Sequence, residues 1–441
     1  MSEKLKSIND KLNPIRNRWI VVIGAILVQL ALGTIYSWST ITLFATPYLK
    51  FFDAMVTKEA TTFIFAFGLV SFAVTMIFAG KLQQKYGPKL IAIIGGILLA
   101  IGVIASAAMT TFIGMLITYG IIFGCGIGFA YVCPIACASK WFPDKKGFIN
   151  GIAVAGFGMG SFIFNYLIKF LANPTNIDVD VAPLAFQQTV LLNVPIMFIV
   201  IGIIYLVMVV VGALTLINPP EGWKPEGWNP PPASVEDGIS GLDFTRGQMI
   251  KLPQFWMLWL AFVFSAICGL MTIGAYSSFA KDLPPGIINA EFFLTTVGAL
   301  AAMFNGAGRI VWGALADKIN YKRTMMVMFL TQGILILIFF ATGLNEILFL
   351  IFVCLLYFCF GGNFSLFPSA TADLFGNKNL GPNYGIVFTA YGIAGFLGAT
   401  LVLLFAGFEV YGYLILFIIM GLMSFGAMVI AYILKPPTKE R

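Results

Sequence analysis

The chain has 441 residues, of which 59% are hydrophobic and only 10% are charged, with a formal net charge of +7. Soluble domains carry about 25% charged residues, so this composition excludes an ordinary soluble protein and predicts an integral membrane protein with many spans. The sequence contains no histidine, which is the usual metal ligand and proton carrier near neutral pH. We therefore expect no metal and no cofactor.

Apolar segments of about 20 residues follow one another along the chain and predict twelve transmembrane helices. The first opens at Trp19 and is too long for the hydrophobic region of a secretion signal, so we expect it in the mature protein. The expected helices cover residues 19–44, 60–80, 89–110, 111–138, 147–171, 185–216, 253–280, 290–316, 323–343, 345–372, 383–407 and 411–434. Very short connections separate the third helix from the fourth and the ninth from the tenth, and these two divisions rest on total length.

Residues 217–252 interrupt the apolar pattern near the midpoint with a stretch rich in proline, glycine and charge. We interpret this stretch as a cytoplasmic linker between an N-terminal six-helix half, residues 1–216, and a C-terminal six-helix half, residues 253–441. The resulting fold class is an all-α membrane protein of two pseudo-symmetric halves.

An internal repeat supports two related halves. The segment that begins at Gly80 recurs from Gly313, an offset of 233 residues. Two more landmarks recur at an offset of 234, Pro134 as Pro368 and Gly151 as Gly385. Parallel six-helix repeats around a central site describe a known transporter architecture.

The lysines and arginines predict the orientation of the chain. With both termini placed in the cytoplasm, 21 of the 26 basic residues fall in cytoplasmic segments and 4 in outer segments. Cytoplasmic loops carry such an excess, so we expect a multi-pass protein of the plasma (inner) membrane with both termini cytoplasmic. The positive net charge is explained by this orientation, and we expect no nucleic-acid partner.

Arg309 is the most informative residue, because it lies inside an uncharged run between Glu291 and Asp317. A charge at that depth costs several kcal/mol, roughly 2.5–3.5 on insertion scales, so it normally faces a cavity or a partner. The alternative is a side chain that extends to the cytoplasmic surface. Helical side chains lean toward their own N-terminus, which directs Arg309 toward the membrane centre instead. No acidic residue shares the interior of its helix, which suggests that the missing anion is the substrate.

Glycines cluster on the expected fourth and fifth helices, including Gly156, Gly158 and Gly160. Such clusters also occur in nucleotide-binding loops, but no strand precedes either of them. Small residues let membrane helices approach closely, and we interpret these glycines as packing positions.

Several motifs resemble those of a known family of membrane carriers. Residues 313–318 (GALADK) resemble the loop signature of the major facilitator superfamily, and Gln84 stands where the first-half copy of that signature places aspartate. Within the superfamily, five segments resemble the oxalate/formate antiporter family: Asn17-Arg-Trp19, Tyr36-Ser-Trp38, Trp141-Phe-Pro-Asp144-Lys-Lys-Gly147, Pro253-Gln-Phe-Trp256 and Phe304-Asn-Gly306 leading to Arg309. The likeness covers nearly the whole chain.

This resemblance implies transport of small carboxylates by alternating access. The oxalate carrier has a second cation, a lysine, at the position of Tyr391, and proton-linked monocarboxylate transporters have an aspartate at the position of Asn305. Two cations suit a dianion, whereas one suits a monoanion. The resemblance also places Tyr36 and Tyr131 near the family's central cavity. The remaining implied residues are Phe360 and Phe364 as cavity aromatics, and Asp317, Asp144 and Gly313 as gating or structural positions.

We therefore expect a secondary transporter of a small monocarboxylate such as lactate, formate or pyruvate, with Arg309 as the carboxylate anchor and no enzymatic activity. Tyr36, Tyr131 and Tyr391 would add hydroxyl groups, and Asn305 would orient the arginine. The expected partners are the monocarboxylate, the lipid bilayer and, in the symport alternative, a proton, and we expect a monomer. The rival interpretations are an oxalate/formate-type anion exchanger, a multidrug-type exporter and a non-transporting membrane receptor.

Overall fold

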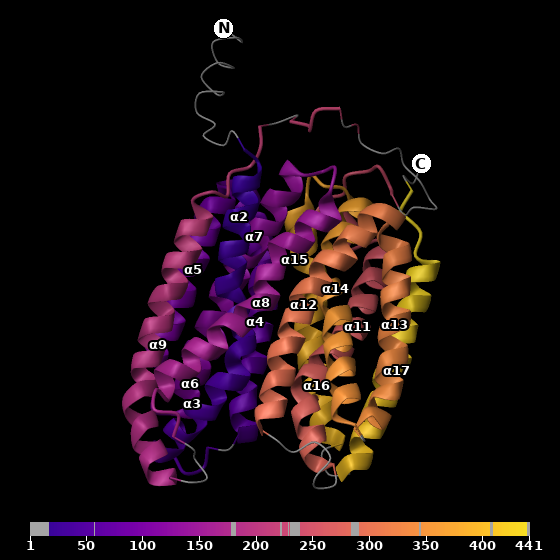
Figure 1. The fold of residues 1–441 in the computed structure, drawn as a ribbon. Helices are drawn as coiled ribbons and strands as arrows, with labels where there is room; N and C mark the ends of the chain where they lie inside the picture. The colour runs from indigo at the N-terminus through magenta and orange to yellow at the C-terminus, as the bar shows by residue number, and fades with distance from the viewer. Residues whose placement is uncertain are drawn as a thin grey trace.

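The described part of the chain is almost entirely helical, and its long helices run side by side as one bundle (Figure 1). The structure is a computed structural model. It describes residues 17–56, 58–177, 182–220, 223–227, 229, 239–283, 291–343, 345–405 and 409–438.

The first helix group precedes the linker. It consists of α2 (Trp19–Leu32), η1 (Gly33–Ser37), α3 (Trp38–Phe52), α4 (Lys58–Tyr86), α5 (Pro88–Ser106), α6 (Phe112–Met115), η2 (Leu116–Phe123), α7 (Gly124–Trp141), α8 (Lys146–Ala172) and α9 (Pro183–Ala213). Of these, α2, η1 and α3 form one continuous span that is longer than predicted, and α6, η2 and α7 form another.

The second helix group follows the linker. It consists of α11 (Pro253–Asp282), α12 (Glu291–Ile319), α13 (Tyr321–Thr342), α14 (Glu346–Phe375), α15 (Leu380–Val387), α16 (Thr389–Phe405) and α17 (Glu409–Ile433). The short helix α10 (Arg246–Met249) lies in the linker itself. Figure 1 shows the two groups as neighbours, and the described linker residues lie at the end of the bundle where α2 begins and α17 ends. We call this the linker end.

The twelve predicted spans are confirmed. Eleven stretches of the described residues are long and apolar enough to cross a membrane. The remaining span consists of α15 and α16, which have 8 and 17 residues and meet at Phe388. There the backbone N–H of Tyr391 donates to the carbonyl oxygen of Phe388 at 2.9 Å, a tighter turn than that of an α-helix.

The two divisions that rested on length are confirmed as well, and the sequence provides a cap at each. Thr111 precedes α6, and its side chain accepts a hydrogen bond from the backbone N–H of Gly114 at 3.1 Å. Asn345 precedes α14 and accepts from the N–H of Leu348 at 3.0 Å. Both side chains satisfy a backbone donor that a new helix leaves without a partner, so each marks where a helix starts.

Two glycine-mediated crossings join the helix groups, and the sequence repeat relates them. Gly151 of α8 lies against the carbonyl oxygen of Arg309 in α12, and Gly385 of α15 lies against that of Met76 in α4. A Cβ atom at either glycine would clash with the facing backbone, so only glycine permits this approach. The offset of 233 residues that relates Gly80 of α4 to Gly313 of α12 places Met76 at the position equivalent to Arg309. The two crossings therefore have similar backbone contacts, but only the second helix group has an arginine at this position.

The linker contacts both helix groups at its own end of the bundle. The backbone N–H of Phe244 donates to the carbonyl oxygen of Phe375 at 2.8 Å, and the side chain of Asn383 donates to the carbonyl of Phe244 at 3.0 Å. Arg246 donates from Nη1 to the carbonyl oxygen of Ile77 in α4 at 3.2 Å. The proposed limits of the linker, residues 217 and 252, stay predictions, since part of this stretch lies outside the described residues.

Candidate functional site

Arg309 lies deep in the bundle, ten residues before the last residue of α12 at the linker end. Its side chain is 0% exposed. Nε donates to Oδ1 of Asn305 at 2.9 Å, and Nη1 donates to the carbonyl oxygen of Val154 at 2.9 Å. The remaining nitrogen, Nη2, is buried and has no hydrogen-bond partner among the described residues. The two bonds fix the plane of the guanidinium and leave its outer edge available.

No described carboxylate forms an ion pair with Arg309. Two aromatic rings contact its guanidinium instead: Cζ lies 4.1 Å from the ring centroid of Phe364 and 5.3 Å from that of Phe157. Such cation–π contacts contribute about 2 kcal/mol when desolvated. They stabilise the charge but accept no conventional hydrogen bond. The hydroxyls of Tyr36 and Tyr131 lie nearby, but Nη2 has no partner in hydrogen-bond geometry among the described residues.

The hydroxyls of Tyr36 and Tyr391 join the two helix groups at the site, with 2.6 Å between their oxygens. The ring of Tyr36 meets Phe157 edge to face at 5.3 Å, and that of Tyr391 meets Phe364 in the same way at 5.3 Å. The tyrosine bridge therefore rests on the two rings that contact the arginine.

Two further tyrosines, Tyr131 of α7 and Tyr384 of α15, have buried hydroxyls without a hydrogen-bond partner in the described ranges. The ring centroid of Tyr131 lies 5.2 Å from that of Phe157 and 5.1 Å from that of Phe388. Tyr384 packs against the same Phe388, with 5.7 Å between the centroids. Tyr131 is among the site residues predicted from the sequence, whereas Tyr384 is not. The signal was present, because Tyr384 lies seven residues before Tyr391, two turns away on the same helical stripe.

The structure brings together the seven predicted substrate-binding residues: Arg309, Asn305, Tyr36, Tyr131, Tyr391, Phe360 and Phe364. The ring centroid of Phe360 lies 5.3 Å from that of Phe364 and 6.5 Å from that of Tyr391. The rings of Phe157 and Phe388 and the carbonyl of Val154 also belong to the site, although the sequence did not predict them. An apolar residue in an apolar helix carries no periodic signal that distinguishes a site-facing ring from a packing ring.

Gly158 lies directly against the polar atoms of the site. A Cβ atom there would lie 2.7 Å from Oδ1 of Asn305 and 3.1 Å from Nε of Arg309, so the hydrogen bond between them would have to shift. The interpretation of Gly158 as a packing glycine is thus incomplete, because its missing side chain leaves room for that bond.

We predict that Gly158→Ala raises the KM for the transported anion about tenfold, because the displaced Asn305 no longer holds the guanidinium in place. The matched control is Gly68→Ala in α4, where the nearest atom to the added Cβ would lie at an ordinary 3.6 Å. Uptake kinetics of both variants in proteoliposomes, at equal protein content, check the prediction. An unchanged KM in Gly158→Ala would contradict it.

The predicted gating residues Asp317 and Gly313 lie apart from this cluster, at the linker end. Asp317 of α12 accepts from the backbone N–H groups of Gly147 and Phe148 at 2.9 and 2.8 Å, and so caps the N-terminus of α8 from the other helix group. A carboxylate at a helix N-terminus is stabilised by the helix dipole. A Cβ at Gly313 would clash with the carbonyl oxygen of Gly147. These contacts hold α8 and α12 together at the linker end.

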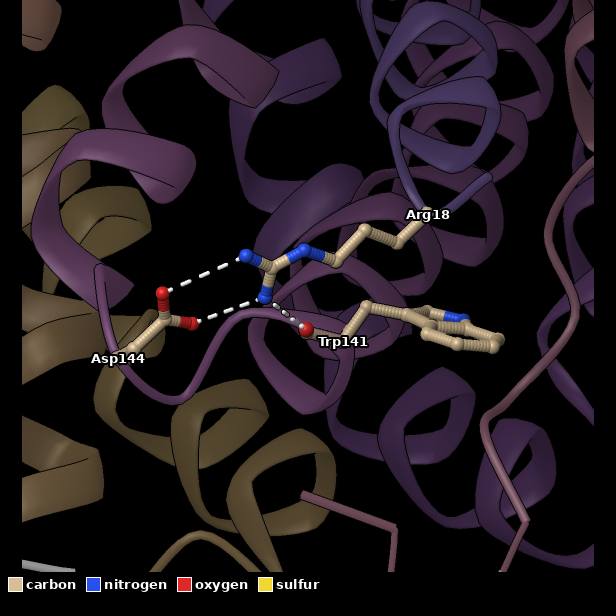
Figure 2. A network of polar contacts seen from close by, with 3 residues as sticks. All are labelled: Arg18, Trp141 and Asp144. Atoms are coloured by element: carbon tan, nitrogen blue, oxygen red, sulfur yellow. Dashed lines mark hydrogen bonds and ion pairs between the residues drawn. The ribbon is translucent and has the colours of Figure 1, made fainter. Parts of the chain in front are cut away.

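The third predicted gating residue, Asp144, makes its contacts within the first helix group. Figure 2 shows its carboxylate facing the guanidinium of Arg18, with 3.0 Å between Oδ1 and Nη1. The same Nη1 donates to the carbonyl oxygen of Trp141 at 3.2 Å, and the guanidinium lies 4.1 Å from the ring centroid of Phe142. Asp144 thus fastens the start of α2 to the loop between α7 and α8.

Comparisons with known proteins agree with this architecture. The sequence profile of the Major Facilitator Superfamily matches residues 21–399 and 266–441. Over 383 residues the chain is 30% identical to the uncharacterised MFS-type transporter YhjX of Escherichia coli strain K12, with 86% of each chain covered. It is 29% identical to the apicoplast pyruvate carrier 1 of Toxoplasma gondii, covering 85% of this chain and 81% of the carrier. It is 28% identical to the oxalate:formate antiporter of Oxalobacter formigenes, covering 95% and 92%.

Among solved structures, the proton:xylose symporter XylE superposes with a TM-score of 0.69 at 13% identity, over 94% of this chain and 95% of that one. That likeness concerns the fold alone. Taken with the profile match over most of the chain, it makes this protein a multi-pass membrane transporter, and not an enzyme, of the Major Facilitator Superfamily.

Proposed function

We propose that the protein carries a small monocarboxylate across the membrane by alternating access, with Arg309 as the anchor of the carboxylate. The observation that carries this proposal is the buried guanidinium, whose Nη2 has no partner in the described part of the chain. Arginine cannot lose its proton in a protein, so the charge persists when the site is empty. Its burial is costly unless an anion arrives.

The geometry supports an end-on, two-point contact. Asn305 occupies Nε and Val154 accepts from one N–H of Nη1, so the second N–H of Nη1 and those of Nη2 remain for a ligand. At the end of a guanidinium, one N–H of Nη1 and one N–H of Nη2 point in parallel, and this pair would match the two oxygens of a carboxylate in a strong, charge-assisted contact. The rings of Phe157 and Phe364 would cover the apolar part of a small substrate.

The charge count favours a monoanion. Arg309 is the single charged side chain among those fully buried in the described ranges. The second position that carries a cation in the oxalate carrier holds Tyr391, and the repeat-related position in the first group holds Met76. A dianion would leave one charge without a partner in this site, which is costly in a low-dielectric interior.

Val154 suggests how loading is coupled to movement. Its carbonyl belongs to the first helix group and Arg309 to the second, so this hydrogen bond spans the two groups. Opening of the linker end would separate α8 from α12 and break this hydrogen bond. The guanidinium of Arg309 would then lose its acceptor at Nη1 as well. A bound carboxylate would replace the lost acceptor, so the loaded protein would move more readily than the empty one. The excess of basic residues at the linker end supports a cytoplasmic location of this end, in the plasma (inner) membrane.

The mode of coupling follows from which groups can titrate. Asn305 stands where a proton-carrying aspartate would lie in related monocarboxylate transporters, and the sequence has no histidine. We favour proton symport over exchange, because a site with a single cation resembles that of lactate carriers. Exchange of one monoanion for another is the second candidate, favoured by the 28% identity to the oxalate:formate antiporter.

We predict electroneutral transport, since either mechanism moves no net charge, whereas uniport of a monoanion responds to voltage by about 2.3 kcal/mol per 100 mV. The test is uptake of labelled lactate, pyruvate, formate and oxalate into proteoliposomes at clamped zero voltage, with and without an inward proton gradient. Accumulation driven by the gradient supports symport. Accumulation only against an internal counter-anion establishes exchange, and transport of none of the four acids would sink the proposed function.

A further inference from the structure

Tyr131 and Tyr384 present two unpaired hydroxyls at the boundary between the helix groups. Each ring is 0% exposed, and neither hydroxyl has a hydrogen-bond partner within the described residues. Tyr131 comes from α7 of the first group and Tyr384 from α15 of the second. A buried hydroxyl normally finds a partner, so two such groups that lie together call for an explanation.

The two hydroxyls lie beside the arginine site. The two hydroxyls lie close to each other, and that of Tyr131 also lies close to Arg309, but neither reaches hydrogen-bond geometry. The hydroxyl of Tyr384 lies within electrostatic range of Arg309. The ring of Phe388 contacts both tyrosines, and Phe157 links Tyr131 to the guanidinium. A ligand anchored on Arg309 therefore has the pair as its next polar neighbours.

Unpaired burial alone does not distinguish these tyrosines. Tyr119 and Tyr205 also have buried hydroxyls without a partner in the described ranges. Tyr119 packs against Trp38 and Phe198, and Tyr205 packs against Phe164, all within the first helix group. Among the described residues, neither ring packs against the aromatic rings around Arg309. The distinguishing feature of Tyr131 and Tyr384 is their joint position beside the anchor.

We propose that Tyr131 and Tyr384 form a second polar subsite that binds the oxygen at C2 of a 2-hydroxy or 2-oxo monocarboxylate. A phenol hydroxyl can donate or accept, so the pair can bind a hydroxyl or a carbonyl oxygen. The C2 oxygen lies beside the carboxylate in such acids, just as the tyrosines lie beside Arg309. The inference rests on the proposed function and narrows it: lactate and pyruvate bind better than propionate, which has the same carbon skeleton and no C2 oxygen.

A site that is built to hydrogen-bond a substrate oxygen discriminates strongly against the analogue that lacks it, because the protein's own groups then stay unpaired. Removal of one neutral hydrogen bond typically weakens binding five- to tenfold, roughly the factor expected for a single tyrosine hydroxyl. The effect should be confined to substrates that carry the C2 oxygen.

The test compares wild type, Tyr384→Phe and Tyr119→Phe, the last as a matched buried hydroxyl away from the site. In proteoliposomes, Tyr384→Phe should raise the KM for lactate about five- to tenfold and leave the KM for propionate unchanged, and Tyr119→Phe should change neither. Tyr384→Phe should also melt no lower than wild type in detergent without substrate, because it removes an unsatisfied group. An equal shift for both acids, or no shift for lactate, would overturn the subsite.

Arg309→Gln separates this inference from the proposed function. Suppose that Arg309→Gln abolishes transport of both acids and that Tyr384→Phe changes the KM for lactate and for propionate equally. The role of Arg309 as carboxylate anchor is then supported, and the C2-oxygen subsite is rejected. If Arg309→Gln carries lactate as well as wild type does, the proposed function fails first, and the subsite fails with it.

Discussion

Arg309→Gln should abolish carboxylate transport while the protein still inserts and folds. Glutamine can keep a hydrogen bond within its helix but provides no charge and no second parallel donor. Loss of one partner of a buried ion pair costs about 2–5 kcal/mol, which corresponds to a loss of affinity of roughly 30- to 4,000-fold. Initial uptake rates of labelled lactate, measured at matched protein content, check this result.

Arg309→Lys should be defective as well, despite its charge. Lysine lacks the planar fork and cannot bond to Asn305, to Val154 and to a carboxylate with the same geometry. We therefore expect the affinity for the carboxylate to fall roughly 10- to 100-fold.

The stability of Arg309→Gln distinguishes a binding role from a structural role. Removal of a buried charge that no described carboxylate pairs should leave the melting temperature of the ligand-free protein unchanged or higher. If the arginine were needed for folding, the substitution would lower this melting temperature. A variant that melts normally and still transports lactate at the wild-type rate would contradict the anchor.

Tyr391→Lys should lower the affinity for monocarboxylates and allow oxalate to bind. The lysine would remove the hydroxyl bridge to Tyr36 and add a second cation beside the aromatic cluster of Phe364 and Phe388. A monoanion then leaves one buried cation unpaired, which costs about 3–5 kcal/mol. Competition of oxalate and of lactate against labelled substrate measures both changes.

Tyr391→Phe is the control for this prediction, because it removes the same hydroxyl without adding charge. It should weaken lactate transport modestly and gain no oxalate binding. If the phenylalanine variant gains oxalate equally, the gain arises from lost packing or lost hydrogen bonding, and the charge-count argument is wrong.

The parts of the fold that depend on the bilayer could be predicted from the sequence. Apolar length determines where a chain can cross a membrane. The excess of lysine and arginine in alternate loops predicts which side each loop faces, and that orientation stays a prediction. The two shortest connections were divided by total length alone, and the caps at Thr111 and Asn345 show in the structure where the new helices start. The break at Phe388 could not be predicted, since neither glycine nor proline marks it and the apolar pattern continues through it.

The candidate site was predictable where a residue conflicts with its surroundings. Arg309 is conspicuous because a charge in an apolar helix is costly, and Asn305 follows as its neighbour one turn away. Tyr384, Phe157 and Phe388 conflict with nothing in their helices, so their place at the site depends on tertiary packing alone. Gly158 shows the same limit, since small residues serve helix packing throughout membrane proteins and only the structure places this glycine against Asn305.

The central claim is that the buried guanidinium binds the carboxylate of a monoanion, and paired isotherms test it most directly. The affinities of lactate and of lactamide, its uncharged amide, are measured calorimetrically on the purified wild type and on Arg309→Gln. We predict that wild type binds lactate and does not bind lactamide, and that Arg309→Gln binds neither. Equal binding of lactate and lactamide by wild type, or retained lactate binding by Arg309→Gln, would contradict the account.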